Sequence, residues 1–114
     1  MSKLPKHYTR FMKDFPEVGR AYRDLGDAVG EAGSLDTKTI ELVKLGMSLG
    51  AKIEGAVHSH ARKALESGAK REEIVHAVLQ ATTTLGFPTM MMGLSWVEDV
   101  FEDSEIPSPL KGDG

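Results

Sequence analysis

The sequence lacks cysteine altogether. This absence excludes disulfides, thiolate nucleophiles and thiolate metal sites together. Clusters of basic residues are missing as well, because acidic and basic side chains are interspersed and the net charge is −3. A surface that binds nucleic acid or an anionic membrane needs clustered lysine and arginine, so we expect neither partner.

Long apolar runs are also absent. No stretch is long enough to cross a bilayer, and no apolar leader with a small-residue cleavage site opens the sequence. We therefore expect a cytoplasmic protein. A chain of 114 residues can build one hydrophobic core but not two. We predict a single domain over 1–103 and a disordered tail over 104–114.

Apolar residues recur at helical spacing along the chain, and no segment alternates as a strand does. This pattern predicts an all-α fold with helices over about 4–15, 18–33, 37–50, 53–67, 71–85 and 89–101. The third of these six helices is apolar around most of its circumference, which predicts that it is buried. The last helix carries more methionine and aromatic residues than one small core needs, which indicates a homo-oligomer interface.

The third and fourth helices are joined by a short connection, which predicts a central antiparallel hairpin. Glu41 lies about as far before the turn as His60 lies after it, so the two side chains can meet at an interhelical spacing of roughly 8–10 Å. His60 faces apolar neighbours with a carboxylate across the hairpin, an arrangement suited to a general acid or base. The alternatives are a core histidine held by Glu41, or a surface pair of Glu41 with Lys38 or Lys44.

The second histidine of this segment, His58, shares the opposite helix face with Glu54 and Arg62. We expect these three to form a solvated ladder at i, i+4 spacing. Because His58 and His60 point apart and no HExxH spacing exists, we expect no metal here. A site formed by both histidines with Glu41 or Glu54 is the remaining alternative.

An ordered set of short motifs runs from Leu35 to Pro88. It consists of a Leu-Asp turn, a glutamate in the following helix and a histidine-bearing helix, and then Ala-Leu, Gly-Ala, Glu-Glu-Ile and Gly-Phe-Pro. In this combination the segment resembles the carboxymuconolactone decarboxylase family, which includes the alkylhydroperoxidase AhpD-like proteins. The resemblance implies an AhpD-like helical bundle that assembles as trimers or hexamers, with sites near subunit contacts.

The redox-active branch of that family carries a Cys-x-x-Cys pair before its histidine. Matched on His60, those two positions are Ile53 and Ala56 in this chain. The family's glutamate matches Glu41, and the acidic residue that often follows the first cysteine matches Glu54. Thiol peroxidase chemistry needs one thiolate to attack the peroxide and a second thiol to resolve the product, so we do not expect it here.

The decarboxylase branch has no such cysteines and needs no cofactor. The resemblance therefore implies a decarboxylase-like enzyme acting on a small carboxylated lactone or related acid. In this interpretation His60 donates the proton and Glu41 orients the His60 ring. The alternative is a catalytically silent, oligomeric binding or scaffold member of the family.

A decarboxylase of this kind also needs a cation for the substrate carboxylates. Lys44, Lys52 and Arg62 are candidates for that role. Glu54 and His58 complete the set of candidate substrate contacts.

Overall fold

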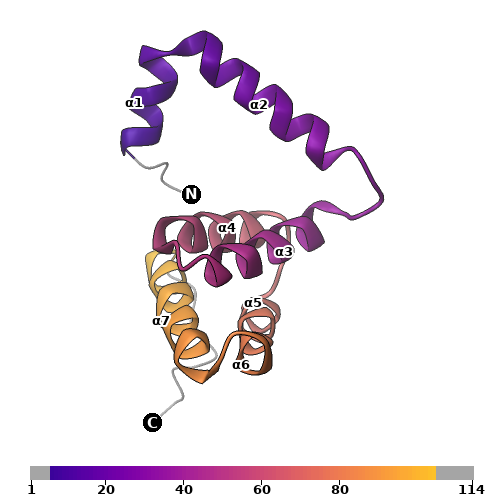
Figure 1. The fold of residues 1–114 in the computed structure, drawn as a ribbon, viewed down its shortest axis with the longest axis vertical. Helices are drawn as coiled ribbons and strands as arrows, with labels where there is room; N and C mark the ends of the chain where they lie inside the picture. The colour runs from indigo at the N-terminus through magenta and orange to yellow at the C-terminus, as the bar shows by residue number, and fades with distance from the viewer. Residues whose placement is uncertain (1–5, 105–114) are drawn as a thin grey trace. The chain divides into compact units, whose positions relative to one another are not determined.

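The computed structural model describes residues 6–104, which form seven α-helices and no strand (Figure 1). The predicted all-α class is therefore confirmed. The chain divides into two compact units, 1–35 and 36–114. The proposed tail after Ser104 and the proposed helix start at residue 4 lie outside the described residues. Over 6–104, no helix combines the length and apolar character that crossing a membrane requires.

The first unit is a pair of helices, α1 (Lys6–Asp14) and α2 (Pro16–Gly30). Pro16 takes the first position of α2, where a backbone N–H would have no helical partner in any case. The two helices meet at an angle at Phe15, as Figure 1 shows. The predicted break between the first two helices is present.

Close approach between α1 and α2 depends on Gly19, the buried residue of α2. A Cβ atom at this position would collide with the sulfur of Met12. The apolar stripe of α2 nevertheless stays open, with between 55% and 64% of each residue exposed at Val18, Tyr22, Leu25 and Val29. Within this unit, α1 therefore leaves the stripe uncovered.

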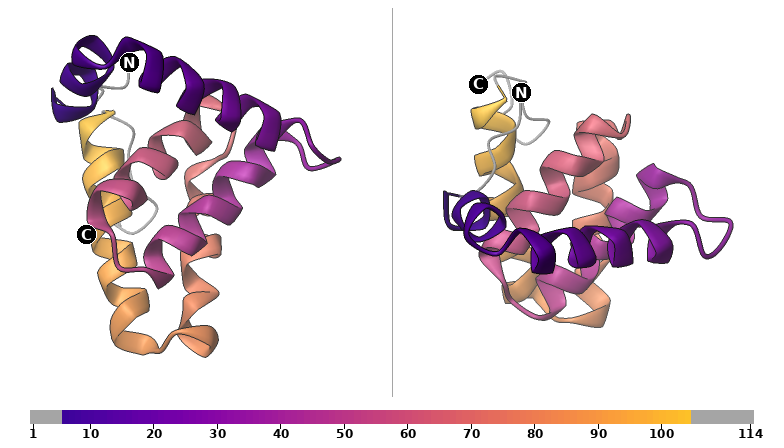
Figure 2. Two further views of the ribbon diagram at one scale, coloured as in Figure 1. Left: turned by 45° about the horizontal axis from the view of Figure 1, so that its top comes forward. Right: turned by 90° about the horizontal axis from the view of Figure 1, so that it is seen from above.

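The second unit begins with the predicted hairpin of α3 (Thr37–Gly50) and α4 (Glu54–Glu66). Asp36 is the N-cap of α3, and its Oδ1 accepts a hydrogen bond of 2.8 Å from the Thr39 amide. The turn passes through Lys52 in the left-handed conformation, with φ of 58°. Figures 1 and 2 show the two helices side by side.

The single helix predicted over 71–85 is wrong in one respect, because it is divided into α5 (Arg71–Leu79) and α6 (Ala81–Thr84). Three threonines follow the division. The Thr82 hydroxyl donates a hydrogen bond of 2.7 Å to the carbonyl of Leu79. Such a side-chain bond competes with the helical ladder, which explains why the helix does not continue unbroken.

The last helix, α7 (Phe87–Asp103), is longer than the predicted 89–101. It follows Gly86, whose φ of 106° suits glycine and turns the chain into the helix. Pro88 lies in the first turn, where proline is tolerated. The prediction treated this proline as part of the break and so began the helix too late.

One core cluster lies entirely in the second unit. Its largest fully buried side chains are Phe101, Leu45, Leu49, Ile74, Val57, Val78 and Val97. Gly93 of α7 lets this helix approach its neighbours, since a Cβ there would lie 2.7 Å from Leu49 Cδ2 and 2.9 Å from Val78 Cγ1.

Burial around α3 differs from the prediction. Leu45 and Leu49 are buried, but Val43 is 42% exposed and Met47 68% exposed. The prediction that α3 is buried on most sides is therefore wrong within the second unit, because the other helices of this unit cover only part of α3. On α7, by contrast, much of the apolar surface is buried in the core. Trp96 is partly buried and packs against the core cluster.

Candidate functional site

The side chains of Glu41 and His60 meet across the hairpin of α3 and α4. Nδ1 of His60 lies 2.8 Å from Oε1 of Glu41. The His60 side chain is 20% exposed and that of Glu41 13%, so solvent reaches both only partly. The hydrogen bond expected from the position of the turn is present.

This hydrogen bond assigns the state of the His60 ring. Ionised Glu41 only accepts hydrogen bonds, so Nδ1 must carry the hydrogen and donate it. Nε2 of His60 is then the atom that can take up or release a proton, and no partner for it is found over residues 6–104.

Around His60, α4 has one face buried in the core and one face that is more exposed to solvent. Val57 and Ala61 are fully buried, which holds the helix on the core. The two positions that carry cysteine in the redox-active branch lie in the first part of this segment. Ile53 is the N-cap of α4 and 54% exposed, and Ala56 is half-buried.

No candidate cation forms an ion pair with Glu41 in the described part of the chain. Nζ of Lys38 lies 3.1 Å from Oε2 of Glu73, so the alternative of a surface pair between Lys38 and Glu41 is wrong. Over residues 6–104, no ion pair joins Lys44 or Arg62 to Glu41. The roles of Lys44, Lys52 and Arg62 toward a substrate remain predictions.

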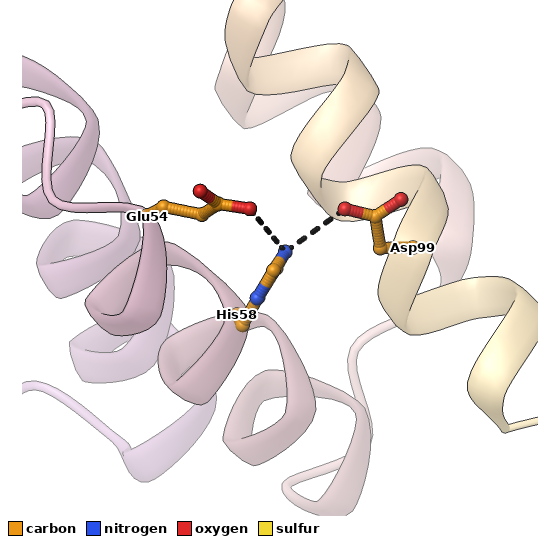
Figure 3. Close-up of side chains that lie close together, drawn as sticks. All are labelled: Glu54, His58 and Asp99. Carbon is orange, nitrogen blue, oxygen red and sulfur yellow. Dashed lines mark hydrogen bonds and ion pairs between the residues drawn. The ribbon is translucent and has the colours of Figure 1, made fainter.

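A second polar cluster lies between α4 and α7 (Figure 3). Nε2 of His58 is 3.0 Å from Oδ2 of Asp99 and 3.9 Å from Oε2 of Glu54. The expected i, i+4 pair of Glu54 and His58 is present. However, the description of a ladder on a solvated face is incomplete, because His58 also reaches across to α7.

Sequence reasoning missed Asp99. It stands in a helix that is otherwise mostly apolar, next to Glu98, and this acidic pair was the available signal. The pairing itself joins residues 41 positions apart on helices that are not consecutive. Helical phase alone does not identify such a partner.

A pocket of about 240 Å³ opens elsewhere in the second unit. It is lined by Gly46, Leu49, Ala77, Gln80, Ala81, Thr84 and Leu85, from α3, α5 and α6 and the residues beside them. Most of these side chains are small or apolar. Neither Glu41 nor His60 belongs to this lining.

Comparison with known proteins agrees with the fold. The model of the carboxymuconolactone decarboxylase family matches residues 16–99. An uncharacterised protein of Haemophilus influenzae is 33% identical over 63 residues, which are 55% of this chain and 56% of that protein. The chain thus spans little more than half the length of this relative.

A solved structure has the same fold. The crystal structure of apo-lpg0406, a carboxymuconolactone decarboxylase family protein from Legionella pneumophila, is 25% identical in sequence with a TM-score of 0.72. The similarity covers 85% of this chain and 86% of that one. The family match over most of the sequence and the shared helical architecture lead to one conclusion: the chain belongs to the carboxymuconolactone decarboxylase family.

Proposed function

We propose that this protein is a cofactor-free, decarboxylase-like enzyme of its family that acts on a small carboxylated lactone or related acid. The observation that carries the proposal is the 2.8 Å hydrogen bond between Glu41 and His60 in a partly buried site. The absence of cysteine removes the thiol chemistry of the redox-active branch. Acid and base chemistry is what the remaining residues support.

The reaction divides into two steps. The bond between the substrate and its carboxylate breaks, carbon dioxide leaves, and the electron pair stays on the substrate as a dienolate. His60, charged and held by Glu41, then donates the proton on Nε2 to carbon and becomes neutral. Nδ1 keeps its hydrogen and its hydrogen bond to Glu41 throughout. Solvent then restores the proton on Nε2.

Glu41 acts in this scheme as a positioning residue. It keeps the ring in one tautomer and one orientation through its hydrogen bond to Nδ1. A cation for the substrate carboxylate is drawn from Lys44, Lys52 or Arg62. Glu54 and His58 remain proposed substrate contacts on the other face of α4.

Carbon dioxide release from carboxymuconolactone tests this proposal. We expect turnover by the wild type and a loss of roughly 10²- to 10⁴-fold in His60→Ala, the usual contribution of a general acid. Glu41→Gln should lose less in kcat and leave KM nearly unchanged. His76→Ala removes an exposed histidine of α5 and is the matched control. Absence of turnover by the wild type, or equal turnover by His60→Ala, sinks the proposal.

A second candidate is a catalytically silent binding or scaffold protein. It is favoured by the position of the 240 Å³ pocket, whose lining includes neither Glu41 nor His60. Under this alternative a small apolar molecule binds with the same affinity to the wild type and to His60→Ala. Turnover that depends on His60 excludes it.

Assembly as a homo-oligomer, a trimer or hexamer, is part of the leading proposal, as is a cytoplasmic location. Exposed apolar residues on both units support assembly, since isolated chains rarely leave so many uncovered. On α3 these include Val43 and Met47, and on α7 Phe87 and Met91. Their exposure fits a surface that a second copy covers.

A further inference from the structure

The proposed proton transfer by His60 and Glu41 does not involve the polar cluster between α4 and α7. Glu54, His58 and Asp99 each offer one potential ligand atom, and these atoms all lie within 4.8 Å of one another. Figure 3 shows both carboxylates approaching one ring nitrogen of His58. We propose that these three side chains bind a single divalent transition-metal ion, with Zn²⁺ as the best match.

The distances are close to those that an ion requires. Two ligand atoms bound to one tetrahedral Zn²⁺ at about 2.0–2.2 Å lie roughly 3.3–3.6 Å apart. The measured separations from Nε2 of His58 are 3.0 Å to Asp99 and 3.9 Å to Glu54. The third separation, between the carboxylate oxygens of Glu54 and Asp99, is within 4.8 Å.

A hydrogen on His58 can bond to fewer of these three side chains than a metal ion can. If Nε2 of His58 carries a hydrogen, that hydrogen points to one acceptor, and Asp99 at 3.0 Å is the nearer. Oε2 of Glu54 at 3.9 Å lies beyond hydrogen-bond distance. A cation in the same space bonds to all three ligands and neutralises the two neighbouring carboxylates.

The helices hold the ligands in place before any ion binds. Glu54 and His58 are one turn apart on α4 and share a face. Fully buried Val57 precedes His58, and Asp99 stands between the buried Val97 and Phe101 of α7. The spacing of the two helices is therefore set by the core rather than by the cluster itself.

The donor set indicates which ion fits. One imidazole nitrogen with two carboxylate oxygens suits a borderline ion such as Zn²⁺, whereas Mg²⁺ prefers oxygen ligands alone. The Glu54 side chain is 57% exposed and that of Asp99 54%, so water can take the fourth position of a tetrahedral site. Three protein ligands and one open position leave the ion accessible to an anion from solution.

The proposed site is separate from the pair of Glu41 and His60. His58 and His60 point to opposite faces of α4, and the sequence prediction that both cannot hold one ion still applies. The metal site needs Asp99, which that prediction did not include. Its test is independent of any decarboxylase activity.

Titration calorimetry of the metal-free, tag-free chain with ZnCl₂ tests the proposal, with MgCl₂ as the comparison. We expect one Zn²⁺ per chain, no measurable Mg²⁺ binding and an apparent Tm raised by about 10 °C at saturating Zn²⁺. Asp99→Asn and His58→Ala should each weaken Zn²⁺ binding by more than ~10-fold. His76→Ala and Glu72→Gln, which alter exposed residues of α5, should bind as the wild type does.

Two results overturn the proposal. One is the absence of Zn²⁺ binding to the wild type. The other is binding that Asp99→Asn leaves unchanged, since the ion would then be held elsewhere. Because Asp99 is exposed, Asn should be accommodated there, and Glu54→Gln supplies a second variant if Asp99→Asn does not fold.

Discussion

At the scale of single residues, Asp36 shows how one side chain fixes the start of α3. Hydrogen bonds to the Asp36 carboxylate hold its pKa below the usual value of 3.8. The Thr39 side chain has the largest effect and the Thr39 backbone amide the next largest. The charged form is therefore favoured in the folded chain. Glu73 is similar, because the Lys70 amide and then Lys38 lower its pKa from 4.5.

A lowered pKa predicts a definite pH dependence for Asp36. Its contribution to stability is complete above the unfolded-state value of about 3.8 and is lost as the pH falls through the lower folded-state value. Asp36→Asn keeps a capping side chain without the charge. We expect this variant to have a lower Tm than the wild type near pH 7, and the difference to shrink as the pH falls below the usual Asp value. Thermal unfolding followed by circular dichroism measures it.

Asp36→Ala is the useful comparison, because alanine removes the cap at every pH. It should remain less stable than the wild type throughout. A difference between the wild type and Asp36→Asn that does not change with pH would contradict the proposed role of the charge.

At the scale of helices, the packing of α7 against its neighbours depends on a missing side chain. A Cβ at Gly93 would press on Leu49 and Val78, both buried and unable to move aside freely. We expect Gly93→Ala to lower the free energy of unfolding by about 1–3 kcal/mol, the usual cost of overpacking. Chemical denaturation with urea measures the change.

Gly46→Ala is the matched control for that experiment. Gly46 is also inside a helix, α3, but no heavy atom lies within 4 Å of a Cβ built there. Alanine in an uncrowded helical position should be neutral or stabilising by about 0.5–1 kcal/mol. Equal losses for both variants would contradict the proposal that crowding by Leu49 and Val78 sets the effect at Gly93.

Most helices could be predicted from the sequence because their ends carry local signals. Asp36, Pro16 and Gly68 mark boundaries through their own backbone chemistry, and the structure places a boundary at each. The break after Leu79 was missed, since a hydroxyl bond at the end of one helix leaves no change in the apolar pattern.

The candidate site was predictable only in part. The contact of Glu41 with His60 follows from a short hairpin, in which equal distances from the turn bring residues together. Contacts between non-consecutive helices follow no such rule. Only the structure shows that Asp99 contacts His58 and that the pocket is not lined by His60.

At the scale of the whole molecule, the sequence predicted a buried α3 and the single chain exposes part of it. Val43 and Met47 are 42% and 68% exposed. An apolar pattern indicates that a surface is covered but not which chain covers it. A second copy would remove the difference between the pattern and the structure.

This interpretation predicts that Met47→Lys weakens assembly without unfolding the chain. A lysine at an exposed helix position costs little in the single chain, but burying its charge in an interface is unfavourable. Light scattering after size exclusion should show a lower mass than the wild type. Thr83→Lys, at an exposed position of α6, serves as the control and should keep the wild-type mass. A wild type that is itself monomeric would refute the proposed assembly.

The transfer of a proton from His60 to the substrate is most directly tested by the reaction in D₂O. With carboxymuconolactone as substrate, NMR of the product locates the deuterium that the dienolate takes up when it is protonated. We expect incorporation on one face of the product carbon by the wild type and by His76→Ala, and loss of that single-face incorporation together with the rate in His60→Ala. Deuterium on both faces in the wild type, or unchanged single-face incorporation in His60→Ala, would contradict the role of His60.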